Sequence, residues 1–212
     1  MVIAIDGPAG AGKSTVARAL AERLGFTYLD SGAMYRCVAL AALEAGVDPD
    51  DPDAVAPLAR ELDLGMGPGT VSLDGRDVSA AIRAPEVSAT ASRVSVHPGV
   101  REAMVERQRG CVSNGGWVAE GRDIGTVVCP NAPLKIYLTA SEEERARRRS
   151  AESGEEAGSV LTAMRDRDSR DREREHGALR AADDAIEVDT TGLGVDGVID
   201  RIAGLATERG LA

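Results

Sequence analysis

Residues 1–15, MVIAIDGPAGAGKST, decide the fold. Residues 2–5 form a short apolar run, which is the pattern of a buried parallel strand. Residues 7–14 then fit G-x-x-x-x-G-K-[ST] with every defined position filled. A helix is predicted next, from apolar side chains at helical spacing and a closing glycine: Val16, Leu20, Leu24 and Gly25. A strand, a glycine-rich loop and a helix in this order predict a P-loop that binds a nucleoside triphosphate.

The residue types in this loop suit phosphate chemistry. Glycines let the backbone approach an anion closely, and amide N–H groups can converge on phosphate oxygens with help from the helix dipole. Lys13 is expected to reach the β- and γ-phosphates of ATP, and the Ser14 hydroxyl is expected to ligate Mg²⁺. The predicted ATP-binding residues are Gly7, Pro8, Ala9, Gly10, Ala11, Gly12, Lys13, Ser14 and Thr15. The alternative is a glycine-rich turn that binds nothing, and the flanking strand and helix weigh against it.

Length, charge and composition exclude several classes of protein. A chain of 212 residues is long enough for one well-cored α/β domain. Its net charge of −10 and its aromatic content of 2% argue against a binder of nucleic acid polymers. It has no apolar run of about 18 residues, so we expect no contact with a membrane. Its three widely spaced cysteines fit free thiols in a reducing cytosol, and we expect a cytoplasmic monomer.

Alternating strand and helix patterns predict an α/β fold of the P-loop kinase type. Further strands are expected at 26–29, 117–120, 134–138 and 185–189. They would complete a five-stranded parallel sheet with helices on both faces.

Two segments depart from this alternation. Residues 65–69 are predicted as loop, residues 70–73 as a strand and Asp74-Gly75 as a hairpin turn, which together make a small antiparallel hairpin insert. Residues 141–183 are predicted to form a helical lid.

We expect a single P-loop kinase domain over residues 1–212. Its core would comprise about 1–60, 97–140 and 184–212, its monophosphate-binding insert about 61–96 and its lid about 141–183.

Three polar pairs directly follow predicted strands: Asp6-Gly7, Asp30-Ser31 and Arg122-Asp123. Because the carboxyl ends of parallel strands share one edge of a sheet, we expect the site at that edge.

The segment 164–175 carries arginines at helical spacing. Arg167, Arg170 and Arg174 fall at i, i+3 and i+7, with Asp171 on the same side. Phosphoryl transfer between two phosphorylated substrates requires such positive charge at the site. The alternative is a solvated helix laced with Arg–Asp and Arg–Glu pairs.

Four stretches together closely resemble the bacterial cytidylate kinase family. They are IDGPAGAGKST (5–15), LDSGAMYR (29–36), GRDIGTVV (121–128) and RDRDSRDRER (165–174). Members of that family pass the γ-phosphoryl group of ATP, with Mg²⁺, to CMP or dCMP. The resemblance covers essentially the whole chain and includes the LDGRDVSAAIR hairpin (73–83), which looks like that family's extension of the monophosphate-binding region.

The resemblance implies a role for each matching residue. Ser31, Arg36, Arg122 and Arg174 would hold the phosphate of CMP. Ser92, Arg101 and Asp123 would read the cytosine edge, and Arg167 and Asp171 would contact the sugar and the reacting phosphates. The catalytic residues would be Lys13, Arg122, Arg167, Arg170 and Arg174. Without the resemblance, Ser92 and Arg101 could be ordinary helix-surface residues.

Three other classes of function stay open at this point. The first is a different small-molecule kinase, similar to shikimate kinase or adenylate kinase, against which the hairpin insert and Asp123 argue. The second is a GTP-dependent switch, which would need a guanine-reading N-K-x-D motif, and the third is an acidic scaffold. Lys13 and Lys135 are the two lysines of the chain, and neither can belong to that motif. An acidic scaffold would leave the glycine loop without a purpose.

Overall fold

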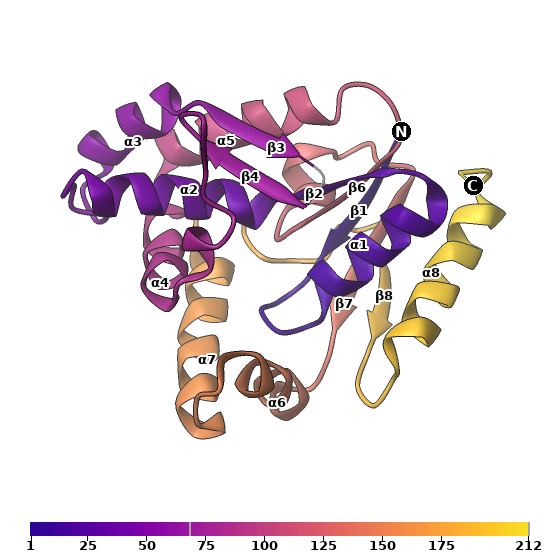
Figure 1. The fold of residues 1–212 in the computed structure, drawn as a ribbon. Coiled ribbons are helices and arrows are strands. Elements are labelled where there is room, and N and C mark those ends of the chain that lie inside the picture. Colours follow the sequence, from indigo (N-terminus) through magenta and orange to yellow (C-terminus); the bar gives the residue numbers. More distant parts are fainter. Residues whose placement is uncertain (68, 212) are drawn as a thin grey trace. The chain divides into compact units, whose positions relative to one another are not determined.

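The chain divides into two units, the first made of Met1–Leu29 and Val112–Ala212 and the second of Asp30–Cys111. A computed structural model describes residues 1–67 and 69–211. The second unit contains the predicted monophosphate-binding insert together with the helices before and after it. Each unit has its own arrangement of elements, drawn in Figure 1.

Five strands form the sheet of the first unit: β1 (Val2–Asp6), β2 (Thr27–Asp30), β6 (Trp117–Gly121), β7 (Leu134–Thr139) and β8 (Ile186–Asp189). Their order is β2-β6-β1-β7-β8. The central strand β1 is parallel to both β6 and β7, and β8 is parallel to β7. Every residue of β1 is buried, as its apolar run predicts. The predicted fold class is confirmed.

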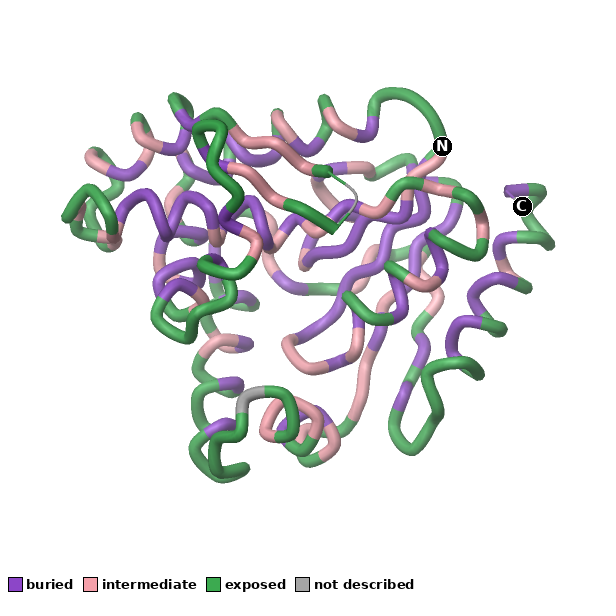
Figure 2. Tube along the Cα trace, in the orientation of Figure 1, coloured by how far each residue is buried: buried purple, intermediate pink, exposed green. Residues whose placement is uncertain are grey.

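The helical elements of the first unit are α1 (Lys13–Leu24), the π-helical turn η2 (Ile124–Val128), α6 (Glu142–Ser153), α7 (Ala157–Glu173) and α8 (Val195–Glu208). Helices α1 and α8 share one core cluster with β1 and β7, which includes Leu20, Ile5, Leu138 and Ile202. The buried stretches of these elements are purple in Figure 2. Gly25 ends α1 in a left-handed conformation, with φ of +65°, as predicted.

The second unit consists of α2 (Ser31–Glu44), α3 (Pro52–Glu61), β3 (Leu64–Gly67), β4 (Thr70–Leu73), β5 (Arg76–Asp77), η1 (Ala81–Arg83), α4 (Pro85–Val94) and α5 (Pro98–Cys111). Strands β3, β4 and β5 form an antiparallel sheet. Asp51 caps α3 by accepting from the backbone N–H groups of Asp53 at 3.0 Å and Ala54 at 3.2 Å. This confirms the antiparallel insert and adds one strand to it.

The prediction of a loop over residues 65–69 is wrong for its first three residues. They belong to β3, where Gly65 lies opposite Ser72 and Gly67 lies opposite Thr70. A Cβ atom on Gly65 would lie 2.2 Å from Ser72 Oγ, and one on Gly67 would lie 2.6 Å from Thr70 Oγ1. The glycines therefore permit a close cross-strand approach rather than a loop. Pro68 lies outside the described residues.

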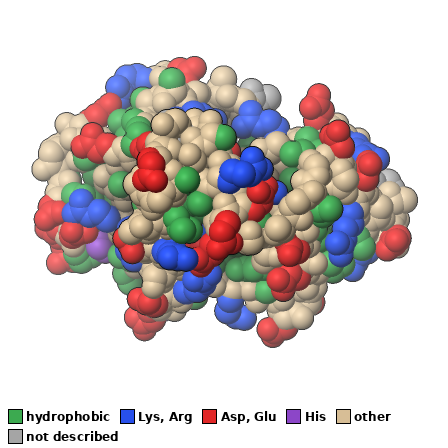
Figure 3. Space-filling model, turned by 90° about the horizontal axis from the view of Figure 1, so that it is seen from below, with side chains coloured by type: hydrophobic (Ala, Val, Ile, Leu, Met, Phe, Trp, Pro, Cys, Tyr) green, Lys and Arg blue, Asp and Glu red, His purple; other side chains and the backbone are tan. Residues whose placement is uncertain are grey.

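The surface carries both signs of charge. Acidic and basic side chains are interspersed over the face drawn in Figure 3. Within the described part of the chain, no helix combines the length and the apolar character needed to span a membrane.

Gly7 separates the end of β1 from β7 and provides a test of this packing. Its φ is +151°, and a Cβ atom would lie 2.1 Å from the backbone oxygen of Leu138. Gly7→Ala should therefore lower the free energy of unfolding by about 1–3 kcal/mol. Gly204→Ala in α8 is the matched control, because a Cβ there meets no atom within 4 Å. It should raise the free energy of unfolding by up to about 1 kcal/mol.

Urea unfolding followed by circular dichroism measures both variants. Equal free energies of unfolding for the two variants would contradict the close approach of β1 to β7.

Candidate functional site

The loop between β1 and α1 has the backbone of an anion-binding loop. Gly7, Gly10 and Gly12 all have positive φ, at +151°, +75° and +86°. No side chain caps the start of α1, so its first amide groups face the loop. Ser14 and Thr15 are exposed in the first turn of α1. This arrangement suits the predicted binding of phosphate.

Lys13 is the buried first residue of α1. Its Nζ atom donates to the backbone oxygen of Pro8 at 2.7 Å, across its own loop. Burial and the neighbouring Arg122 guanidinium together lower the pKa of Lys13 to about 7, against the opposing effect of the Glu120 carboxylate. A phosphate beside this ammonium group would compensate for both burial and the neighbouring guanidinium group.

Arg122, at the end of β6, meets residues of α7 in a buried charge cluster. Its Nε donates to Asp171 Oδ2 at 2.9 Å, and Arg174 Nη1 lies 3.5 Å from Asp171 Oδ1. Burial would raise the pKa of Asp171, but Arg122, Arg167 and Arg174 hold it below its ordinary value. Three guanidinium groups thus act on the Asp171 carboxylate, and the carboxylates of Asp168 and Glu120 also act on Arg122. Four of the predicted site residues are thus brought together.

The other two predicted residues of this unit occupy different surroundings. Asp123 is buried directly before the π-helical turn, and its backbone oxygen accepts from Val127 N at 2.8 Å. Arg170 is exposed on α7, and its Nε donates to the backbone oxygen of Asp166 at 3.2 Å. The predicted helical stripe is thus incomplete: Arg167 is half-buried and Arg170 exposed on α7, whereas the buried Arg174 follows the last residue of that helix.

The remaining predicted residues lie on three helices of the second unit. Ser31 and Arg36 belong to α2, Ser92 to α4 and Arg101 to α5, and α2 packs against both other helices. Arg36 Nη2 donates to Asp30 Oδ2 at 2.7 Å. The buried Arg101 guanidinium lies 5.8 Å from the centre of the Tyr35 ring. Neither Ser92 nor Arg101 is a surface residue, because each is only 3% exposed.

Arg145 and Asp168 tie the P-loop to α6 and α7, and neither was predicted from the sequence. Asp168 Oδ2 accepts from Arg145 Nη1 at 2.6 Å, and Asp168 Oδ1 accepts from Ala9 N at 3.2 Å. Arg145 Nη1 also donates to the backbone oxygen of Ala9 at 2.9 Å. Both side chains are buried. Nothing in the arginine run ERARRR distinguishes Arg145 from its neighbours, so the pattern carried no signal.

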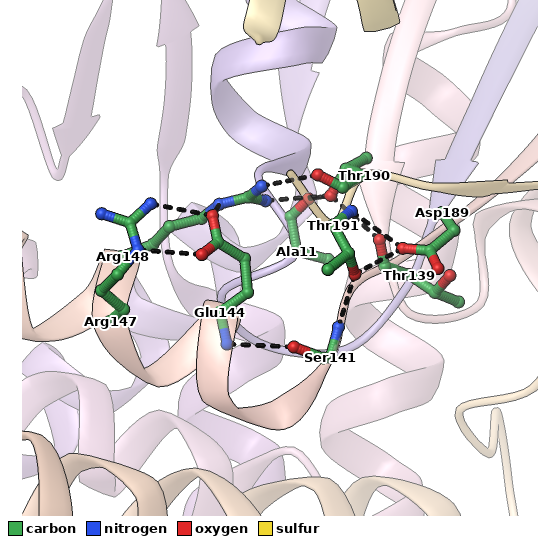
Figure 4. Close-up of polar contacts among 9 residues, drawn as sticks. All are labelled: Ala11, Thr139, Ser141, Glu144, Arg147, Arg148, Asp189, Thr190 and Thr191. Atoms are coloured by element: carbon green, nitrogen blue, oxygen red, sulfur yellow. Dashed lines mark hydrogen bonds and ion pairs between the residues drawn. The ribbon is translucent and has the colours of Figure 1, made fainter. Parts of the chain in front are cut away.

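Arg148 makes a second link, from α6 to the loop after β8, as Figure 4 shows. Its Nη1 donates to Thr190 Oγ1 at 2.9 Å, and its Nη2 donates to the Thr190 backbone oxygen at 2.8 Å. Its Nε donates to Glu144 at 2.8 Å. The Thr190 hydroxyl donates to the backbone oxygen of Thr139 at 2.9 Å and lies 3.5 Å from that of Ala11. These contacts connect the ends of β7 and β8 to the P-loop.

Glu120 is a further buried carboxylate that was not predicted as a site residue. It pairs in register with Ile5 of β1 and accepts from the Tyr28 hydroxyl at 2.5 Å. Its effect on the pKa of Lys13 places it within electrostatic range of the P-loop. The signal was present in the sequence, because Glu120 is an acidic residue next to the end of the otherwise uncharged strand β6.

The Arg145–Asp168 pair gives a prediction about stability. Asp168→Ala would leave the buried Arg145 guanidinium without its charge partner and the Ala9 N–H without its acceptor, and should cost about 3–5 kcal/mol of unfolding free energy. Asp183→Ala is the control, because Asp183 is exposed and lies 3.7 Å from Arg180. It should change the unfolding free energy by less than about 1 kcal/mol. Urea unfolding measures both variants. Similar small losses of unfolding free energy in the two variants would contradict a stabilising role for the Arg145–Asp168 pair.

Comparison with known proteins agrees with these features. A family model described as cytidylate kinase matches residues 3–208. The chain is 49% identical over 216 residues to a cytidylate kinase of Solibacter usitatus, across 99% of this chain and 93% of the relative. It is 48% identical over 219 residues to a bifunctional pantoate ligase/cytidylate kinase of Synechococcus sp., across 98% of this chain but 45% of that longer protein. The crystal structure of a gluconokinase from Sinorhizobium meliloti shares the fold, with a TM-score of 0.50 and 18% identity over 99% of this chain and 93% of that chain. The chain belongs to the cytidylate kinase family.

Proposed function

We propose that this chain transfers the γ-phosphoryl group of ATP to CMP and dCMP, which gives ADP with CDP or dCDP. The observation that carries the proposal is the buried cluster of Arg122, Asp171 and Arg174 in the same unit as P-loop Lys13. A phosphoryl-transfer site needs converging positive charge of this kind. Family membership supports CMP as the acceptor and decides against the shikimate-kinase-like, adenylate-kinase-like and GTP-switch alternatives.

The P-loop is assigned to ATP, the phosphoryl donor. Its backbone amides and Lys13 would bind the β- and γ-phosphates of ATP. The exposed Ser14 hydroxyl and the buried Glu120 carboxylate are hard oxygen donors, which fit Mg²⁺. We assign both to the ion, directly or through water. When bound, the ion neutralises charge on the transferring phosphate.

The phosphate of CMP is assigned to Ser31, Arg36, Arg122 and Arg174. Arg36 supports this assignment because Asp30 fixes one end of its guanidinium group at 2.7 Å. Its Nε is buried and, in the described part of the chain, has no hydrogen-bond partner. A fixed guanidinium group with a spare buried donor is suited to an oxyanion.

The cytosine base is assigned to Ser92, Arg101 and Asp123. A carboxylate accepts from an exocyclic amine, so Asp123 would favour cytosine, which has that amine, over uracil, which has a carbonyl group there. Arg167 and Asp171 are assigned to the sugar and the reacting phosphates. Arg170 is assigned to the phosphates on closure of the lid formed by α6 and α7.

The chemistry needs no general base. A phosphate oxygen of CMP is already anionic near neutral pH and can attack the γ-phosphorus in line with the leaving ADP oxygen. Lys13, Arg122, Arg167 and Arg174 would neutralise the charge spread over the transferring group. Catalysis then rests on positioning and electrostatic stabilisation.

A coupled assay of ADP release tests the function directly. Full-length chain with ATP and Mg²⁺ should turn over CMP and dCMP strongly and UMP weakly, because Asp123 selects the cytosine amine. AMP, GMP and shikimate should give only background release. Turnover confined to one of those last three would retain a P-loop kinase but reject the cytosine assignment. An absence of acceptor-dependent turnover would reject the kinase assignment.

The lowered pKa of Lys13 makes ATP binding a proton-linked event. At a pH roughly one unit above the pKa of about 7, most Lys13 side chains are neutral in the free protein. Triphosphate binding raises that pKa, so binding should take up a proton. Calorimetry in buffers of different ionisation enthalpy measures this uptake. Lys13→Arg is the control, since arginine stays charged, and it should abolish the uptake. Equal uptake in the two proteins would contradict the assignment to Lys13.

The cytoplasmic location and the monomeric state stay predictions. Light scattering coupled to size-exclusion chromatography measures the second of these. A monomer mass would support it, and a dimer mass would contradict it.

A further inference from the structure

Asp6 is a buried carboxylate that the proposed chemistry does not use. It is the last residue of β1, only 5% exposed, and it pairs in register with Gly121 of β6 and Tyr137 of β7. Its backbone continues directly into the P-loop at Gly7. Burying a carboxylate costs free energy unless its oxygens are hydrogen-bonded, so its partners indicate why it is there.

Each carboxylate oxygen of Asp6 accepts a hydrogen bond from one of two consecutive backbone amides in the same turn. Oδ1 accepts from Ile124 N at 2.8 Å, and Oδ2 accepts from Gly125 N at 2.7 Å. These amides immediately follow Arg122 and Asp123, which are assigned to the acceptor nucleotide. The carboxylate thus connects the strand that carries the P-loop to the turn that carries the acceptor-binding residues.

The turn has little freedom to move away from this carboxylate. A Cβ atom on Gly125 would lie 3.4 Å from Asp6 Oδ2 and 3.2 Å from Cδ of Lys135. Lys135 is itself held, because its Nζ donates to the Pro130 backbone oxygen at 2.5 Å and to Asp184 at 2.8 Å. Gly125 is therefore enclosed between Asp6 and the Lys135 side chain.

We infer that Asp6 is a positioning residue for the acceptor site: its carboxylate clamps the amides of residues 124 and 125 and so sets the placement of Arg122 and Asp123. This inference rests on the proposed function. A carboxylate suits this position because each of its oxygens faces a different N–H donor, and an asparagine side chain would present its NH₂ group to one of them.

The Asp6 carboxylate can act in two ways, through its charge on nearby ionisable groups and through its hydrogen bonds to the turn. The pKa of Asp6 is raised to about 6. Burial and the Asp123 carboxylate raise it, and the two backbone hydrogen bonds and Lys13 oppose the rise. Loss of the negative charge could therefore act through Lys13, in which case binding of ATP would suffer. Loss of the clamp would act through Arg122 and Asp123, in which case use of CMP would suffer. The two kinetic constants distinguish these routes.

The test is Asp6→Asn, compared with Asp51→Asn in the full chain. Asp51 also accepts from two backbone amides but caps α3 on the surface, so its substitution matches the loss of charge. Asp6→Asn should lower kcat/KM for CMP by about tenfold or more and leave KM for ATP within about threefold. Asp51→Asn should change neither constant.

Hydrogen–deuterium exchange tests the clamp without depending on catalysis. The peptide containing residues 122–128 should exchange faster in Asp6→Asn than in wild type, and Asp51→Asn should leave it unchanged. Unchanged exchange in Asp6→Asn overturns the clamp. Faster exchange with an unchanged kcat/KM for CMP overturns its role in positioning, as does a rise confined to KM for ATP.

Failure of the proposed function would be recognised separately, because wild-type protein would then lack CMP turnover while the exchange comparison still reports on the clamp. If Asp6→Asn does not fold, Gly125→Ala takes its place. The added methyl group would lie 3.2 Å from Lys135 Cδ, closer than an ordinary contact, and 3.4 Å from Asp6 Oδ2, so it should displace the turn and lower kcat/KM for CMP about threefold or more. An unchanged value would overturn the inference.

Discussion

Parallel pairing of β1 with β6 and β7 is the constraint on which the first unit depends. The register places Asp6 level with Gly121 and Tyr137, so the P-loop and the Arg122–Asp123 turn leave the sheet at one edge. Shifting either strand by one residue would turn these side chains to the other face. A single geometric relation therefore brings the P-loop together with the turn to which we assign part of the acceptor site.

Charge at this edge is buried in matched groups rather than left in water. Arg122 contacts Asp171, Arg145 contacts Asp168, and Asp6 receives two backbone amides. Buried ion pairs contribute little to stability compared with apolar packing. Their value lies in geometry, because each one holds the P-loop or a segment beside it in place. Lys13 is the exception, since burial has lowered its pKa to about 7 and an incoming polyanion would restore its charge.

The backbone of this site could be predicted from the sequence, and most of its buried polar contacts could not. Apolar runs and a closing glycine predicted the strands and α1, because burial dictates those patterns. The segment 65–67 was misread because glycines that permit close strand pairing look the same as loop glycines. Asp168 lies in a run without apolar residues, so its burial against Ala9 is a tertiary effect that no local pattern carries. Arg174 follows the last residue of α7, which removes it from the expected helical stripe.

Transfer of radioactive label from the γ position of ATP to CMP tests the central claim most directly. Full-length chain, Mg²⁺, labelled ATP and CMP are incubated together, and the nucleotides are separated. The account predicts that label leaves ATP and enters CDP in step with ADP formation, and that it stays in ATP when CMP is omitted. Label appearing in inorganic phosphate, or remaining in ATP in the presence of CMP, would contradict it.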